Sequence, residues 1–400
     1  MRQRWLIAVL MAGATSLAVA GDWRGSWDGT LYGYSGADAL NGASVLNPGN
    51  RIANLAQHSD TAEARFDLKA ATASWRFTAL PILQVRTTDT SGRGNAAYLS
   101  RWRLGWRVAP AWSVSAGREL LNWGAAQFRS PSSPFYFDNG RTDPMRVLSG
   151  MDAAVLSWTP DLHRSLTLAR IAGSGHAAAV PDPWRDGWLA RWAQRGEDWS
   201  GGLALAQAAG RAPFVGLNLQ RTLDDAWLLY AEASSGTRSN ALASPANAAQ
   251  PFALQAESPR RSDWLLGASY TLDDGQSLYA EFLHDGHGYT AAQEQAWFAR
   301  AVAAPSAAGM ALGYAPSLLG RDYLHLVWQS NLMDSTGYWR AMATHSITDG
   351  GNQLSGYAEY LLHGQVSLFV LGAFSPGGAR REFSALLRRS LTVGVKLALP

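Results

Sequence analysis

The stretch Glu63-Ala-Arg-Phe-Asp-Leu-Lys-Ala70 alternates between charged and apolar residues without a break. Its odd-numbered positions are Glu63, Arg65, Asp67 and Lys69, and its even-numbered positions are alanine, phenylalanine and leucine. Because successive side chains of a strand point to opposite faces, this period of two predicts a strand with one charged and one apolar face. Four charges on one face need water, so the strand has one wet and one dry side.

The same alternation recurs along the chain. In Leu99–Val108 the tryptophans and leucine at even positions alternate with Arg101, Arg103 and Arg107. We predict about 18 such strands, with about 16 as the lower bound. The runs are Trp23–Tyr34, Glu63–Ala71, Trp75–Thr87, Leu99–Val108, Trp112–Gly117, Met151–Trp158, Ser165–Ile171, Trp188–Gln194, Leu203–Ala208, Val215–Gln220, Trp227–Ser234, Trp264–Leu272, Ser277–His284, Tyr323–Gln329, Tyr338–His345, Gly356–Leu362, Val366–Phe374 and Leu386–Leu399.

Short and long connections separate these runs. Thr159–His163 and Leu272–Gly275 are brief turns, whereas the segments near 35–61, 125–150, 237–262 and 287–320 are long. This pattern is typical of an all-β, antiparallel, up-and-down transmembrane barrel with short periplasmic turns and long extracellular loops. Within the last long loop, the composition of Thr290 to Ala304, followed by Pro305, predicts a helix.

The start of the chain predicts export. Arg2 and Arg4 precede the apolar run Trp5–Met11, and Ala18-Val-Ala20 follows, which is the order of a cleavable signal peptide over residues 1–20. Residues 22–400 then form one domain, because no linker or charge block divides them. Removal of two arginines leaves the 34 basic residues close to balance with the 31 acidic ones, so charge gives no argument for a nucleic-acid partner.

Composition narrows the class further. No cysteine is present, which excludes disulfide scaffolds and thiolate metal sites. Of the 18 tryptophans, many stand at ends of the predicted strands, where an indole ring suits the boundary between lipid and water. The alternative is that these rings fill a soluble β-core. The final run alternates to Leu399 and reads as a strand that closes the barrel, so we predict a location in the bacterial outer membrane.

Few residues predict catalysis or metal binding. His345 and Ser346 are adjacent, so a strand would point them to opposite faces, unlike the His-x-Ser arrangement of outer-membrane phospholipases. A lipid hydrolase is therefore the least favoured alternative. His284, Asp285 and His287 could hold a metal, but they are also ordinary residues at the edge of a turn. We predict no catalytic residue, no metal site and no cofactor.

Basic residues favour a passage for anions. By strand phase the charged face carries Arg65, Lys69, Arg76, Arg86, Arg101, Arg103 and Arg107. In a membrane barrel that face is the lumen, and a cationic lumen wall concentrates anions. The open alternative is that Glu63, Asp67 and Asp89 neutralise this wall, which then has no selectivity.

The most distinctive stretch is Gly117-Arg-Glu-Leu-Leu-Asn-Trp-Gly124, followed by Phe128-Arg-Ser-Pro-Ser-Ser-Pro-Phe135, Arg141-Thr-Asp-Pro144 and Ser149-Gly-Met-Asp152. It resembles the alginate-export-like barrels and related large outer-membrane porins, although Glu119 stands where that pattern has glutamine. The resemblance implies an eighteen-stranded channel for an anionic polysaccharide or small solutes, with an arginine-rich constriction closed by loops. It also implies that Arg118, Arg129 and Arg141 contact the solute.

Two functions follow as expectations. The first is an outer-membrane channel that passes a hydrophilic, anionic solute or exopolysaccharide, with the lumen and loop arginines as binding residues. The second is a plugged barrel that anchors or organises surface polysaccharide. The expected partners are outer-membrane lipid and lipopolysaccharide, a hydrophilic or anionic saccharide, and periplasmic export components.

Overall fold

The structure is a computed structural model that describes residues 22–177, 182–242, 254–306, 309, 318–331, 333 and 336–399, with backbone alone for 239–242 and 254–257. The predicted signal peptide over residues 1–20 lies outside the described residues. Among those that are described, no helix has the length and apolar character needed to cross a membrane.

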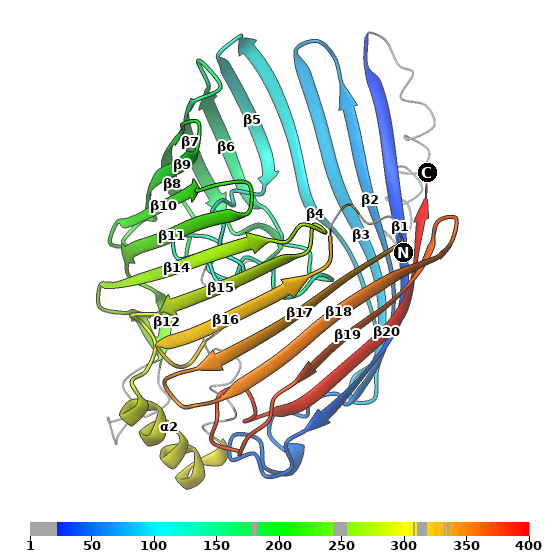
Figure 1. Cartoon of the computed structure of the whole chain (residues 1–400), viewed down its shortest axis with the longest axis vertical. Coiled ribbons are helices and arrows are strands. Elements are labelled where there is room, and N and C mark those ends of the chain that lie inside the picture. The colour runs from blue at the N-terminus through cyan, green and yellow to red at the C-terminus, as the bar shows by residue number, and fades with distance from the viewer. Residues whose placement is uncertain are drawn as a thin grey trace.

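Eighteen antiparallel strands form one sheet that closes on itself (Figure 1). Each strand pairs with its neighbour in the chain, and β1 pairs with β20 to complete the ring. The strands are β1 (Arg24–Leu40), β2 (His58–Ala71), β3 (Trp75–Thr88), β4 (Gly92–Ala109), β5 (Trp112–Glu119), β6 (Met151–Trp158), β7 (Arg164–Gly173), β8 (Gly187–Arg195), β9 (Trp199–Gln207), β10 (Phe214–Thr222), β11 (Trp227–Gly236), β14 (Arg261–Thr271), β15 (Ser277–His284), β16 (Asp322–Gln329), β17 (Gly337–Ser346), β18 (Asn352–His363), β19 (Val366–Phe374) and β20 (Leu387–Leu399).

The predicted fold is confirmed, and all eighteen predicted runs overlap these strands. The largest differences from the predicted bounds are at the end of β1 and the start of β4, where backbone pairing continues past the alternating pattern. β1 runs on to Leu40 through small and polar residues, since both β2 and β20 pair with it there. β4 begins at Gly92 because it keeps its pairing with β3 as far as Thr88. The first long connection is therefore 41–57, shorter than the predicted 35–61.

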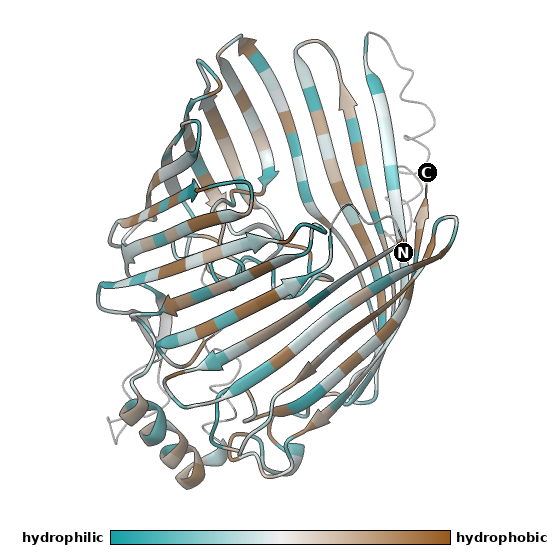
Figure 2. Ribbon diagram, viewed as in Figure 1, coloured by the Kyte–Doolittle hydropathy of each residue, from teal (hydrophilic) through white to brown (hydrophobic). Residues whose placement is uncertain are grey.

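Side chains divide cleanly between the two faces of the wall. Figure 2 shows hydrophilic and hydrophobic positions alternating along the strands. Leucines and valines such as Leu326, Leu266 and Val393 stay exposed on the outer face, which only lipid can cover favourably. Indole rings cluster near the short-turn ends of the strands, where Trp75 and Trp106 stack at 5.6 Å between ring centroids. These rings lie on the outer face, as expected for an interfacial belt.

The remaining elements belong to the long connections. They are the short turns of 3₁₀-helix η1 (Pro48–Asn50) and η2 (Gly175–Ala177), the hairpin of β12 (Ser239–Leu242) and β13 (Leu254–Glu257), and the helix α2 (Ala291–Ala303). The predicted helix is confirmed, with Thr290 as its N-cap in a capping box with Gln293. α2 lies beyond the strand ends (Figure 1) and packs Trp297 and Phe298 against other connections through Leu46 and Ala385.

Candidate solute path and its inner loop

The predicted cationic wall faces the lumen. Register places Lys69 of β2 beside Thr78 of β3, and Thr78 beside Arg103 of β4, so these residues share one face. The opposite face of the same strands carries exposed Trp75 and Leu104. Arg65, Lys69, Arg76, Arg86, Arg101, Arg103 and Arg107 therefore all lie on the inner side of β2–β4.

Part of this wall is neutralised, as the alternative from sequence proposed. Arg65 pairs with Glu63, and Lys69 Nζ lies 3.0 Å from Asp67 and 3.4 Å from Asp28. Arg103 lies 3.3 Å from Glu119 at the end of β5. The expected contribution of Asp89 is wrong, because its carboxylate contacts His58 and the backbone of Gln57 outside the wall.

The other cations of the wall have no hydrogen-bonded or ion-paired partner among the described residues. Within the described part of the chain, Arg76, Arg86, Arg101 and Arg107 make no hydrogen bond and no ion pair within 4.0 Å. A cavity of about 380 Å³ opens against this wall and is lined by Lys69, Thr78, Leu80, Arg101, Arg103 and Glu119, among others. Arg101 is the unpaired arginine that lines this cavity, and a free guanidinium there can bind and release an anion.

A long segment folds into the barrel beside this wall. Residues 120–150, which we term the inner loop, connect β5 to β6 and lie inside the ring of strands (Figure 1). Ala126, Phe128 and Ser132 of the inner loop are almost fully buried. Such burial removes backbone donors from water, so the loop needs partners on the lumen wall.

Two carboxylates of the lumen wall supply these partners. Glu232 of β11 is 2% exposed and accepts from Ala126 N (3.1 Å), from Ser132 N (3.3 Å) and from the hydroxyls of Ser130 and Ser132 (both 2.6 Å). Hydrogen bonds to an ionised acceptor are roughly twice as strong as neutral ones. Glu232 therefore pins the first half of the inner loop to the wall.

Glu281 of β15 binds the backbone of the inner loop in the same way. It accepts from Gln127 N at 2.6 Å and Phe128 N at 2.8 Å, and Tyr230 donates its hydroxyl at 2.6 Å. Arg340 of β17 adds a bond to the Gln127 side chain at 3.0 Å. The loop is thus fixed to β11, β15 and β17 by charged groups.

Gly124 allows the loop to reach Glu232. Its φ is +94°, a conformation that residues with a side chain rarely adopt. A Cβ at this position would overlap the carboxylate of Glu232. The Trp-Gly step that stood out in the sequence therefore marks the point where the loop backbone approaches the wall.

Apolar contacts complete the attachment. Tyr136 is buried in a cluster with Met151, Val155 and Leu189 on the lumen face of β6–β8, and Trp123 and Phe135 pack against it. The inner loop therefore covers the wall from β6 to β17. The inner loop touches the cationic wall where Arg65 donates to Met145 O at 2.7 Å. The unpaired arginines of β3 and β4 therefore lie next to the part of the lumen that the inner loop does not fill.

Of the three arginines implied by the resemblance, Arg129 and Arg141 bond within the inner loop, and Arg118 joins the strands at its base. Arg118 forms a two-bond pair with Asp152 at 2.8 and 3.1 Å and donates to Leu99 O. Arg129 is buried and donates to Phe128 O. Arg141 donates to Ala126 O and Gly124 O. Their use in solute contact stays a prediction, because these bonds already occupy part of each guanidinium.

The residues considered for catalysis and metal binding lie apart or are already paired. Ser346 is buried in the lumen face of β17, whereas His345 contacts Asn352 on the other face. His284 contacts Asp322 at 2.7 Å. Asp285 and His287 do approach each other, together with Asp263.

Arg238 neutralises that group. It donates to both oxygens of Asp285 at 3.0 and 3.1 Å and lies 3.5 Å from Asp263, which supplies the positive charge that a metal ion would bring. The predicted turn at Leu272–Gly275 is confirmed, with positive φ at Gly275.

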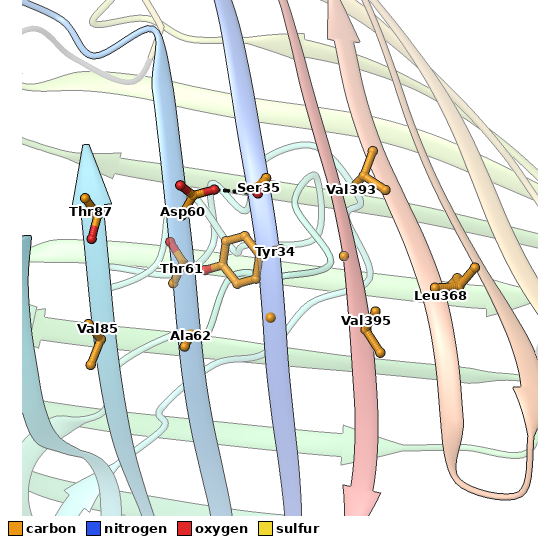
Figure 3. Close-up of a pocket in the computed structure, with 12 residues that line it drawn as sticks. Tyr34, Ser35, Asp60, Thr61, Ala62, Val85, Thr87, Leu368, Val393 and Val395 are labelled. Atoms are coloured by element: carbon orange, nitrogen blue, oxygen red, sulfur yellow. Dashed lines mark hydrogen bonds between the residues drawn. The ribbon is translucent and has the colours of Figure 1, made fainter. Parts of the chain in front are cut away.

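One hollow lies outside the lumen. It measures about 510 Å³ and is a shallow depression on the outer face over β1, β2 and β20, where Gly33 and Ala62 leave room beside Val393 and Val395 (Figure 3). Its polar contact is Ser35 Oγ donating to Asp60 at 2.5 Å. This depression belongs to the lipid-facing surface and is no part of a path through the barrel.

Sequence reasoning missed Glu232 and Glu281. Each stands alone between apolar neighbours, in Ala231-Glu-Ala233 and Ala280-Glu-Phe282, at a lumen-phase position of its strand. An isolated acid in such a strand is a usable signal for a buried acceptor. Nothing local shows that its partner is a loop more than 100 residues earlier in the chain.

Comparison with known proteins locates the fold. No protein-family model matches the sequence, and no curated protein matches it. The structure resembles Acinetobacter baumannii OccAB1 (TM-score 0.57, 8% identity, covering 96% of this chain and 98% of that one). It also resembles Pseudomonas aeruginosa OccK2 (0.55, 15%, 94% and 98%) and P. aeruginosa OprD (0.53, 11%, 94% and 95%). The chain thus has the closed eighteen-stranded fold of large outer-membrane porins, and this fold places it in the bacterial outer membrane.

Proposed function

We propose that this chain is an outer-membrane channel for small hydrophilic solutes and that it favours anionic ones. The observation that carries the proposal is the set of unpaired arginines, Arg76, Arg86, Arg101 and Arg107, on the lumen face of the wall that borders the inner loop. A cationic wall raises the local anion concentration, and several moderate sites allow both entry and exit.

A saccharide acid is the solute class that we propose. The guanidinium fork binds a carboxylate through two parallel hydrogen bonds, and neighbouring hydroxyl side chains such as Thr78 can bind sugar hydroxyls. OccK2, one of the similar structures, has been solved with glucuronate. Export of a whole polysaccharide, with help from periplasmic components, is the broader possibility. The inner loop makes a small solute the better fit, because it occupies the wall from β6 to β17.

The outer face fits the remaining expected partners. Exposed leucines and the indole belt would contact membrane lipid, and basic residues at the outer rim such as Arg93 could contact lipopolysaccharide phosphates. These contacts are part of the proposal.

Single-channel recording tests the function. The mature protein, refolded into a planar bilayer, should give ohmic steps with a reversal potential that favours chloride under a KCl gradient. The triple variant Arg76→Gln, Arg101→Gln, Arg107→Gln should lose most of this preference, because it removes three of the unpaired charges. Arg164→Gln is the matched control, since Arg164 lies at a short turn beside Asp161.

A silent barrel would favour the second candidate, a plugged anchor for surface polysaccharide. The firmly pinned inner loop is the observation behind this candidate. A wild-type channel whose selectivity is unchanged in the triple variant would refute the assignment of the wall. A lipid hydrolase finds no support, because His345 and Ser346 point to opposite faces.

A further inference from the structure

One lumen arginine stands apart from the predicted wall. Arg191 lies in β8, four strands further round the ring than β4. Its neighbours in the chain, Ala190 and Trp192, share the outer face with exposed Trp188, so Arg191 points inward. It faces the beginning of the inner loop, where its guanidinium carbon lies 5.0 Å from the centre of the Trp123 ring.

Arg191 has no anionic partner. In the part of the chain that the structure describes, it makes no hydrogen bond and has no carboxylate within 4.0 Å, and its Nε is shielded from water. The arginines that contact the inner loop from other directions all have acceptors. Arg340 bonds the Gln127 side chain, and Arg65 bonds the backbone carbonyl of Met145.

A glycine in the barrel wall lets the side-chain amide of Asn218 approach Arg191. Gly202 of β9 pairs directly with Asn218 of β10 and with Ala193 of β8, two residues from Arg191. A Cβ on Gly202 would lie 3.0 Å from Nη2 of Arg191 and 2.9 Å from Oδ1 of Asn218. The missing side chain therefore lets both polar groups converge, and Oδ1 of Asn218 also has no hydrogen-bond partner among the residues that the structure describes.

The buried guanidinium of Arg191 lowers the stability of the fold as long as no anion binds it. A cation that is partly removed from water and has no counter-charge is destabilising, whereas the same cation stabilises a complex once an anion reaches it. The indole face of Trp123 holds the guanidinium in place, and its two Nη groups, which have no partner among the described residues, can contact a carboxylate.

We propose that Arg191 and Asn218 form a carboxylate subsite of the channel, at which the acid group of a small solute binds Arg191 and a neighbouring hydroxyl binds the Asn218 amide. This subsite rests on the proposed channel function and adds to it a second anion contact, separate from the arginines of β2–β4.

Block of the channel by a sugar acid measures the subsite. In a bilayer, glucuronate should interrupt the chloride current of the wild type, and neutral glucose at the same concentration should not. In Arg191→Gln the glucuronate concentration for half-block should rise about tenfold, the equivalent of one charge-assisted hydrogen bond. The chloride-to-potassium permeability ratio should fall about twofold to threefold, because a unit charge is lost within several ångströms of the passing ion.

A second variant tests whether Arg191 binds the solute or only supports the inner loop. Trp123→Leu removes the ring under the guanidinium and keeps the charge, so the permeability ratio should stay within experimental error of the wild type. If Arg191 only braces the inner loop, both variants change the conductance and neither changes the ratio or the glucuronate block, which would overturn the subsite.

Further controls keep the outcomes distinct. Arg191→Lys should keep the permeability ratio and weaken glucuronate block, because lysine keeps the charge and loses the fork; it also serves if the glutamine variant does not fold. Arg170→Gln is a control on the outer face of β7, where Arg170 donates to Asp186 O, and it should alter neither quantity. A silent wild type contradicts the channel itself, whereas a conducting wild type with an unaltered Arg191→Gln contradicts only the subsite.

Discussion

Removal of the Glu232 carboxylate should release the inner loop while the barrel stays closed. Glu232 accepts four hydrogen bonds from the segment 126–132 and is 2% exposed. Hydrogen bonds to charged groups contribute about 1.5–3 kcal/mol each, but bonds to one carboxylate are not additive, and its removal also relieves a buried charge. We therefore estimate a loss of about 3–4 kcal/mol in the attachment of the loop.

That loss shifts the equilibrium between attached and detached loop by about 100-fold to 1,000-fold. The strands remain paired through their backbone hydrogen bonds, so the effect is local. Glu232→Ala should raise the single-channel conductance and its noise, and amides of residues 120–150 should exchange hydrogen faster. Glu232→Gln should lie between the wild type and the alanine variant, because its amide oxygen still accepts.

A matched control removes the same charge elsewhere in the lumen. Glu359 of β18 pairs with Lys396 at 2.8 Å and, within the described part of the chain, forms no hydrogen bond or ion pair with the inner loop. Glu359→Ala should leave hydrogen exchange of residues 120–150 unchanged. Wild-type conductance together with wild-type exchange in Glu232→Ala would refute the role of Glu232 as the anchor of the loop.

Three further expectations follow from the structure. Gly124→Ala should detach the inner loop, as Glu232→Ala does, because φ is +94° and a Cβ would overlap Glu232. Wild-type hydrogen exchange of residues 120–150 in Gly124→Ala would contradict this. Leu326→Arg, on the lipid face in the middle of β16, should destabilise the barrel by about 2–4 kcal/mol in urea unfolding from vesicles, whereas Leu162→Arg in a short turn should have no effect. Burial, and then the charges of Asp349 and Glu382, raise the pKa of Glu294 in α2 from 4.5 to about 9. The folded chain then binds more protons than the unfolded chain between these values, so the attachment of α2 should weaken as pH rises from about 5 to 9. Hydrogen exchange of α2 should show this trend in the wild type and lack it in Glu294→Gln.

The strands and their lumen-facing positions could be predicted from local pattern. In Glu63–Ala70 and Leu99–Val108 the period of two assigns every side chain to a face, because a strand leaves no third direction. The alternation of short and long connections predicted the barrel, and Thr290 and Pro305 predicted where α2 begins and ends. These features depend on residues that are neighbours in the chain.

The charge state of the lumen depends on distant residues. Arg103 is neutralised by Glu119 of the next strand, while Arg101, two positions away, stays unpaired. Both arginines have the same pattern in the sequence. Arg103 is the paired one because Glu119, at the end of β5, lies next to it and not next to Arg101.

The inner loop is the clearest case of a feature that only the tertiary structure decides. Its sequence, rich in serine and proline between 128 and 135, is compatible with an extracellular loop or an internal one. Its place is set by Glu232 and Glu281, which follow it by about a hundred residues or more and reach it only because the barrel closes. Period and composition thus determined that this protein is a membrane barrel with basic residues on the inner face of β2–β4, whereas ring closure decided which of these charges remain free and where the inner loop lies.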